Sequence, residues 1–201
     1  KYACWPLGNP ELFLSKVMES LSAEATRLKD NDGNFSHALD VQMLTVVRLV
    51  NDHLGLFGSL LSGQMGHNFA HVLVTIISVP HSNIQSKNAI LQVLNMALNS
   101  NNAQYVELLS RNYTLISGLS ETATAAFDSG DRELLYICLY FLFGVLSKQR
   151  PAVEIALRSG LLFPCIFLFA EDSQDTDMQT LAAALLVTLC VEQKAFEIIR
   201  N

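Results

Sequence analysis

His67 and His71 are the residues whose type and spacing come nearest to metal chemistry. They stand four residues apart, so on a helix they would share one face. A zinc site needs at least one further ligand, and no acid or cysteine accompanies them at a fixed spacing. The acidic stretch 171–177 lacks the glycine and the final glutamate of a calcium-binding loop. We therefore interpret the histidines as a partly exposed polar pair and the acids as a solvated loop, and we expect no metal and no cofactor.

Catalytic and nucleotide-binding motifs give no positive signal. The sequence contains no GxSxG, no cysteine near a histidine, and neither of the phosphate-binding patterns GxxxxGKS/T and GxGxxG. Residues distant in sequence can still converge in a fold, which leaves an all-α enzyme as an alternative. The aromatic residues Tyr136, Tyr140, Phe141 and Phe143 have no basic residues around them, so core packing is favoured over stacking on nucleic-acid bases. We expect a protein that is not an enzyme.

The charge balance and the cysteines narrow the class of partner and the compartment. The chain has 13 Lys and Arg against 19 Asp and Glu, a net charge of -6, and no basic cluster, which disfavours nucleic acid. Cys138, Cys165 and Cys190 lie in apolar stretches, and no pair has the spacing of a metal site or a CxxC motif. Such cysteines are typical of a reducing compartment, so we expect the cytoplasm or the nucleus. The sequence shows no membrane-spanning segment, and we expect no membrane partner.

The stretch 131–148 organises the fold that we expect. Between Leu134 and Leu146 every residue except Gly144 is apolar. This run is too short to cross a membrane as a helix, which takes roughly 20 residues, and too long for an ordinary strand. We therefore predict a helix that is buried on nearly all sides. Half of the chain is hydrophobic, which is enough to supply its neighbours.

Caps and turns divide the chain into helices without a credible strand. Residues 9–11 have the Asn-Pro-Glu pattern of a helix start, and a turn follows Asp30. Gly63 and Gly66 are expected to precede a helix that begins near His67, and Pro164 is expected to kink its helix. The predicted helices cover 10–30, a segment from Ser36, 56–61, 67–79, 82–98, 103–110, 113–127, 131–148, 151–159, 161–170, 178–191 and 194–201.

Segments of the chain resemble one another. The residues from Ala152 align with those from Ala103 at an offset of 49, and the residues from Ala195 align with those from Ala152 at an offset of 43. The helices that precede them also align, at 94–97, 143–146 and 187–190, with a weaker copy at 49–51. The repeating unit is a short helix, a medium helix, a loop and a long apolar helix. One such unit cannot bury its own apolar face, so stacked units would build a continuous core.

This unit resembles the armadillo repeat, a three-helix unit of the α-solenoid class. The resemblance covers residues 9–201 and is most specific in 159–170, which is similar to the family's small-residue and glycine turn between the first two helices. The segments LNMA at 94–97 and LVTLC at 186–190 resemble the end of its third helix. Arg111 replaces the turn glycine in the preceding copy, and HEAT-like repeats are the alternative. The resemblance implies an all-α fold, a right-handed α-solenoid of about four armadillo-like repeats, in a single domain over 1–201.

The resemblance also implies a function, that of a scaffold or adaptor which binds a peptide or helix of a partner protein on its concave face. Armadillo proteins that resemble importins and catenins carry an asparagine near the end of the third helix, where it binds the backbone of an extended peptide. The aligned positions here are Asn51, Asn95, Gly144 and Thr188, and the accompanying groove tryptophan is absent. The alternative is that these are simply polar residues of the third helix.

A partner-binding face follows when the third helices are read at three- and four-residue spacing from those positions. Tyr140 and Asn95 are its expected central contacts, and Gly144 is expected to leave room for a partner beside the Tyr140 ring. The full rows are Lys87, Leu91, Asn95 and Asn99, then Glu133, Ile137, Tyr140, Gly144 and Lys148, then Leu181, Ala184, Thr188 and Glu192. The predicted partner contacts among them are Lys87, Asn95, Asn99, Tyr140, Lys148, Thr188 and Glu192.

The segment 194–201 begins like the first helix of another repeat. Its apolar Phe196, Ile198 and Ile199 lead us to expect that more chain follows or that a second copy docks there, as a homo-oligomer. A structural or dimerisation segment of a larger assembly is therefore the alternative function. Because the first residue is not methionine, we also expect the chain to be a piece of a longer protein.

Overall fold

Every element with described bounds is a helix in the computed structural model. The structure describes residues 9–30, 41–46, 49, 55–78, 87, 90–91, 93–94, 98–99, 103–170 and 175–191. Within these residues there is no strand, which confirms the all-α prediction. The helices are α1 (Pro10–Asp30), α3 (Leu56–Leu61), α4 (Gly63–Ser78), α6 (Ala103–Arg111), α7 (Tyr113–Ser129), α8 (Arg132–Leu146), α9 (Arg150–Arg158), α10 (Leu162–Ala170) and α11 (Thr176–Cys190).

The chain divides into two compact units, Lys1–Val93 and Leu94–Asn201. The first unit holds α1, α3 and α4, and the second holds α6 to α11. A single continuous repeat domain over 1–201 stays a prediction.

In the first unit, α1 packs against α3 and α4. The predicted start of α1 is confirmed, because the Leu12 amide donates to Asn9 Oδ1 at 3.0 Å and so satisfies one of the free N–H groups of the first turn. The buried side chains of α1 recur at spacings of four and three residues, which puts them on one stripe. They are Leu14, Met18, Leu21 and Ala25, and they pack in a core to which α4 contributes Phe69, Val72, Leu73 and Ile76.

The predicted start of α4 near His67 is wrong, because the helix begins at Gly63. Gly63 has a φ of +54°, a backbone conformation that favours glycine. Gly66 lies within the first turn, and its amide donates to the Ser62 carbonyl at 3.0 Å. A Cβ atom on Gly66 would collide with the backbone carbonyl group of Leu61. The two glycines therefore permit a close junction between α3 and α4 rather than a loop.

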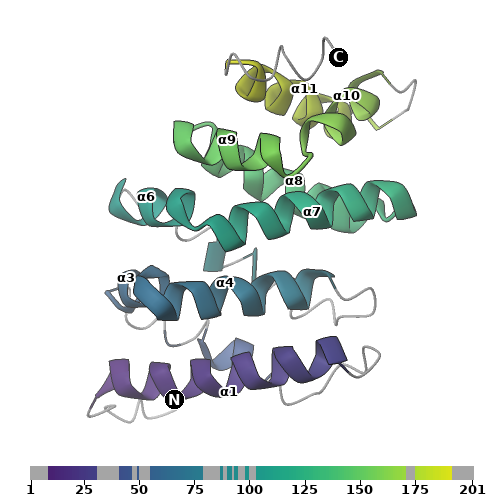
Figure 1. Cartoon of the computed structure of the whole chain (residues 1–201). Coiled ribbons are helices and arrows are strands. Elements are labelled where there is room, and N and C mark those ends of the chain that lie inside the picture. The colour runs from purple at the N-terminus through teal and green to yellow at the C-terminus, as the bar shows by residue number, and fades with distance from the viewer. Residues whose placement is uncertain are drawn as a thin grey trace, which may run out of the picture. The chain divides into compact units, whose positions relative to one another are not determined.

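In the second unit, two successive triads of helices share one pattern of neighbours. α6, α7 and α8 contact one another, and α11 contacts both α9 and α10. Between the triads, α6 contacts α9, α7 contacts α10, and α8 contacts α11. Figure 1 shows α6 and α7 along one level of this unit and α9 along the next. Each helix of the first triad thus meets its counterpart in the second.

The turns of the second unit follow local sequence chemistry. Gly130 has a φ of +75° and ends α7, and the Asp131 amide behind it donates to the Ala126 carbonyl at 2.9 Å. Gly160 has a φ of +83° between α9 and α10, where the sequence predicted a glycine turn.

Two expectations for the second unit are wrong in detail. α10 runs unbroken from Leu162, because Pro164 falls in its first turn, where a missing N–H costs no helical hydrogen bond. α11 begins at Thr176, not at Met178. Asp175 caps it, accepting from the Met178 amide at 3.1 Å, so Asp175 and Asp177 belong to a helix start rather than to a loop.

The helix α8 lies in the middle of the second unit. It contacts α6, α7, α9 and α11, and residues such as Cys138, Leu139 and Leu142 are fully buried. The prediction of burial on nearly all sides is only partly right. Tyr136 is 41% exposed and Tyr140 is 46% exposed, because the four neighbouring helices leave one stripe of α8 uncovered.

Candidate partner-binding surface

The uncovered stripe of α8 carries a pair of tyrosines. Glu133, Tyr136, Tyr140 and Ser147 are exposed at spacings of three, four and seven residues, which places them on one side of the helix. The rings of Tyr136 and Tyr140 stack with their centroids 6.1 Å apart and an angle of 22° between their planes. Core packing was the wrong interpretation for these two rings, although it holds for Phe141, which is buried.

The helix α11 exposes residues at the corresponding positions, 44 residues later in the sequence. Asp177, Thr180 and Val191 are exposed at the positions that correspond to Glu133, Tyr136 and Ser147 of α8. Since α8 and α11 pack against each other, these two exposed stripes lie on neighbouring helices. The α8 stripe is aromatic, whereas the α11 stripe carries threonine and valine.

A cavity of about 520 Å³ lies where α8 and α11 end and α9 begins. It brings together Lys148 and Thr188, two residues that the sequence predicted as partner contacts. The wall is apolar, from valines of α9 and α11, and two cationic side chains, Lys148 and Arg150, line it as well. The described lining residues are Leu146, Ser147, Lys148, Gln149, Arg150, Val153, Val187, Thr188 and Val191.

The position of Lys148 is set by a hydrogen bond across the repeat. Its Nζ donates to the backbone carbonyl of Leu98 at 2.8 Å, fifty residues earlier in the sequence. This bond satisfies a carbonyl, and it fixes one end of a long side chain that is otherwise exposed. An ammonium group carries three donors, so the same Nζ can also bind a carboxylate or a carbonyl of a partner.

Gly144 does not leave room for a partner, contrary to the expectation from the sequence. A Cβ atom at this position would come within 2.7 Å of Leu98 Cδ1, so the side chain of Leu98 already fills the space. Leu98 is itself buried, which makes this contact part of the core of the second unit. The glycine therefore serves internal packing.

The hydroxyl of Thr188 is partly used within its own helix. Its Oγ1 donates to the Ala184 carbonyl at 2.9 Å, as threonine commonly does in a helix. The oxygen still has lone pairs that can accept a hydrogen bond from a partner.

The remaining predicted contacts fall into three groups. Asn99 is exposed. Lys87 is only 8% exposed and so has little surface to offer a partner. Asn95 and Glu192 lie outside the described residues, as does Asn51.

The histidines and cysteines have ordinary environments. His67 is exposed and His71 is half-buried, as expected for a polar pair. Among the residues that the structure describes, no three His, Cys, Asp or Glu side chains are grouped to hold a metal ion. Cys138 and Cys165 are buried and Cys190 is partly exposed, and burial raises the pKa of Cys165 to about 12.

Comparison with known proteins does not assign the chain to a family. No protein-family model matches the sequence, and no curated protein matches it. The resemblance to armadillo repeats therefore rests on the residues and on the helix pattern described above.

None of the described helices is by itself long and apolar enough to span a bilayer. Only α9 and α10 taken together reach the required length and composition, and these two helices meet at a bend of 84°.

The sequence interpretation missed a second cavity, at the opposite end of α8. It is lined by residues of α7, α8 and α10, including Phe127 and Phe167. A signal for it was present in the sequence, because the nine residues of α10 include no polar side chain and a helix of this kind cannot bury every side.

Proposed function

We propose that the chain is a protein-interaction module that binds an extended peptide or a helix of a partner protein across the exposed stripes of α8 and α11. Its architecture in this proposal is a right-handed α-solenoid of about four armadillo-like repeats. The module works without a cofactor in the cytoplasm or nucleus, where free thiols such as Cys190 are stable.

The helix contacts of the second unit support the solenoid. In a stacked repeat, each helix packs on its counterpart in the next copy, and α6 with α9, α7 with α10 and α8 with α11 follow this rule. The caps support the same register. Asp131 accepts from the Leu134 amide and Asp175 accepts from the Met178 amide, both at 3.1 Å and 44 residues apart.

The stacked pair of Tyr136 and Tyr140 is the observation that carries the binding proposal. Both rings are more than two-fifths exposed on a helix that is otherwise core. Tyrosine brings apolar area and a hydroxyl with only two side-chain torsions to freeze, so it contributes much binding energy for little entropy. Stacking restrains the pair before a partner arrives, which lowers the cost of binding further.

The cavity at the ends of α8 and α11 supplies the polar part of the surface. Lys148 and Arg150 favour a partner with acidic side chains near one end of its bound segment, and the valines favour an apolar side chain. Thr188 offers an acceptor to a backbone N–H. This combination suits a segment that is apolar in the middle and acidic at one end.

Tyr140→Ala tests this proposal once a pull-down from native extract has supplied a partner. We expect the variant to lose about 2 kcal/mol of binding free energy, roughly thirtyfold in affinity, because Tyr140 is the central anchor. Tyr113→Ala is the matched control, since Tyr113 is more exposed and lies at the start of α7. Isothermal titration of parent and variants, each checked by circular dichroism, gives the result. If Tyr140→Ala binds like the parent, the stripe of α8 is not the binding face.

A molar-mass measurement in solution separates this function from the alternative of a dimerisation segment. A partner-binding module is expected to be monomeric at micromolar concentration. A dimer that Tyr140→Ala dissociates would assign the same surface to self-association.

A further inference from the structure

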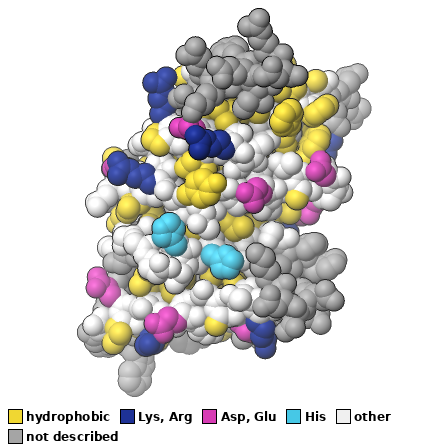
Figure 2. Space-filling model, viewed as in Figure 1, with side chains coloured by type: hydrophobic (Ala, Val, Ile, Leu, Met, Phe, Trp, Pro, Cys, Tyr) yellow, Lys and Arg dark blue, Asp and Glu magenta, His cyan; other side chains and the backbone are white. Residues whose placement is uncertain are grey.

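The outer face of α10 is apolar and uncovered. Phe163 and Phe167 lie one turn apart on this face and are 54% and 59% exposed, whereas Phe169, which is 58% exposed, lies two residues after Phe167 and so on another side of the helix. Figure 2 shows hydrophobic side chains gathered over α10, in the upper right of the view. Two exposed phenylalanines one turn apart on a short helix cost solubility, and an exposed apolar face of this kind usually marks a binding surface.

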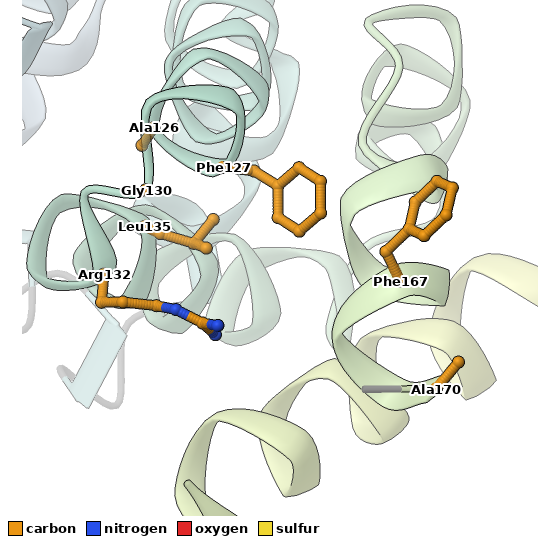
Figure 3. A pocket seen from close by; sticks show the side chains of 7 residues that line it. All are labelled: Ala126, Phe127, Gly130, Arg132, Leu135, Phe167 and Ala170. Atoms are coloured by element: carbon orange, nitrogen blue, oxygen red, sulfur yellow. The ribbon is translucent and has the colours of Figure 1, made fainter. Parts of the chain in front are cut away.

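A cavity of about 450 Å³ adjoins this face, between α10 and the junction of α7 with α8. The rings of Phe127 and Phe167 form its aromatic walls, with centroids 6.0 Å apart and an angle of 26° between their planes. Figure 3 shows the two rings projecting toward each other from α7 and α10, while the Arg132 side chain extends below Leu135 toward the same space. The described lining residues are Ala126, Phe127, Gly130, Arg132, Leu135, Phe167 and Ala170.

We propose that this cavity and the α10 face dock a segment of a partner protein that places one large apolar side chain against Phe127 and Phe167 and a carboxylate against Arg132. The volume falls within the range of roughly 300–1,000 Å³ that is typical of binding cavities. Because the two rings stack on each other, an aromatic or branched aliphatic side chain would lie against their exposed edges and outer faces, with Leu135 as an aliphatic floor.

The charge of Arg132 selects the polar part of the occupant. It is the one charged side chain among the described lining residues. A guanidinium carries five N–H donors in a planar fork that matches a carboxylate, so a bond within the protein leaves donors for a second partner. Arg132 is exposed, so the attraction of an anion to it is modest and adds to the apolar contact with the walls. A cationic or neutral head group lacks this gain.

The cavity of this proposal is distinct from the cavity at the far end of α8. Arg132 and Leu135 lie in the first turn of α8, whereas Leu146 and Lys148 lie at its other end. Because Arg132 precedes Tyr136 by one turn, Phe167 of α10 and Tyr140 of α8 are the residues whose substitution tests the two proposals separately.

Three small probes of equal size test the proposed chemistry on the full chain. 3-Phenylpropionate, 3-phenylpropanol and 3-phenylpropylamine share one ring and differ in head-group charge. Titrations followed by the NMR shifts of ¹³C-labelled phenylalanine rings are expected to give millimolar binding of the carboxylate. The amine should bind about tenfold more weakly or worse, with the alcohol in between. Equal binding of the amine and the carboxylate, or no shift of any ring with the carboxylate, would overturn the proposal.

Variants locate the effect. Arg132→Gln should remove the preference for the carboxylate, and Phe167→Ala should weaken all three probes by about tenfold. Phe169→Ala is the matched control, because Phe169 lies on another side of the same helix, is similarly exposed and does not line the cavity. If Phe169→Ala weakens binding as much as Phe167→Ala, the probes bind exposed phenylalanines in general and not the cavity.

Displayed peptides of twelve random residues extend the test to a macromolecular partner. Peptides selected on the parent chain should carry a large apolar residue within one helical turn of Asp or Glu. They should lose at least about tenfold in affinity on the Phe167→Ala variant. Selected peptides that bind this variant as well as the parent, or that carry Lys or Arg in place of the acid, would contradict the proposal.

Discussion

The helices α8 and α11 hold the same place in successive triads, yet they have different surroundings. Both begin behind a capping aspartate, and both expose the same register. Nine residues of α8 are buried against helices on either side, whereas five residues of α11 are buried. α11 is nevertheless almost as apolar as a core helix, with Val187 and Val191 left exposed. Similar apolar composition therefore does not make two helices equally buried.

Substitution of matched core positions should produce the largest difference between the two helices. Leu142 in α8 is fully buried, and its counterpart in α11, 44 residues later, is the partly exposed Leu186. A carboxylate at a buried site without a partner costs several kcal/mol, against a total of about 5–15 kcal/mol for a domain. We expect Leu142→Asp to abolish folding and Leu186→Asp to leave a folded chain with a lower melting temperature, as measured by circular dichroism.

The variants Leu142→Asn and Leu186→Asn control for charge, because asparagine has nearly the shape of aspartate and is neutral. A soluble Leu142→Asp variant with the melting curve of the parent would show that α8 is not central to the second unit. Equal loss in both aspartate variants would instead place α11 as deep in the core as α8.

Thiol reactivity should separate the two helices next. Cys138 of α8 and Cys165 of α10 are buried, whereas Cys190 of α11 is partly exposed. In a Cys4→Ser background, a disulfide reagent at pH 8 should modify Cys190 first. The buried thiols should react at least about a hundredfold more slowly, because the reagent reaches them only when the unit opens. In urea all three should react alike, and fast modification of Cys138 in the native chain would contradict the burial of α8.

The pH dependence of Cys165 follows from its burial. Its pKa is about 12 in the folded chain against an ordinary value of 9.0, since burial disfavours the thiolate. A raised pKa stabilises the folded state below pH 9, where the thiol is neutral in both states. This contribution is lost as the pH rises from 9 toward 12, because the unfolded chain ionises first.

Local signals predicted most of the helices correctly. Asn9 and Pro10 gave the start of α1, and the helices expected over 131–148 and 151–159 begin within one residue of α8 and α9, because turn and capping signals lie within one turn of a helix start. The start of α4 was missed for a different reason. Gly66 is inside a helix because Leu61 of the preceding helix approaches it, and no property of the glycine itself reveals that neighbour.

The binding surface could be predicted only in part. Lys148 and Thr188 were placed by the repeat register, and they do line one cavity. The exposure of Tyr136 and Tyr140 depends on which sides of α8 are covered by other helices. The apolar composition of α8 does not predict those sides. Likewise, Lys87 has the register of a surface residue and is buried.

Removal of the two caps should have a moderate and unequal effect. Asp131→Ala and Asp175→Ala each delete the side-chain acceptor of a first-turn amide, at about 1 kcal/mol of helix stability. In α8 that loss should lower the urea midpoint of the whole second unit. In α11 it should appear mainly as faster hydrogen exchange of the first turn. Asp131→Asn and Asp175→Asn retain an acceptor and serve as controls. Equal shifts of the urea midpoint in the two alanine variants would show that α8 and α11 contribute equally to the stability of the second unit.

Gly144 and Thr188 hold matched positions, and the smallest expected effect concerns the glycine. Gly144→Ala brings a methyl group to 2.7 Å from Leu98 Cδ1, which is too close, but the obstacle is the end of a flexible side chain. Alanine also favours a helix over glycine by about 1 kcal/mol, so the two effects nearly cancel. We expect a net change of less than about 1 kcal/mol in the free energy of unfolding.

A double-mutant cycle with Leu98→Ala tests whether the Leu98 side chain is what opposes the gain in helix propensity. Truncating Leu98 removes the obstacle, so Gly144→Ala should then stabilise the chain by close to its full helix propensity. The coupling between the two substitutions should therefore be favourable, at about 0.5–1 kcal/mol. Thr188→Ala in α11 is the reference, because it changes the matched position at a residue that already carries a Cβ atom. Zero coupling would mean that Leu98 does not pack over Gly144, and the space beside Tyr140 would again be open to a partner.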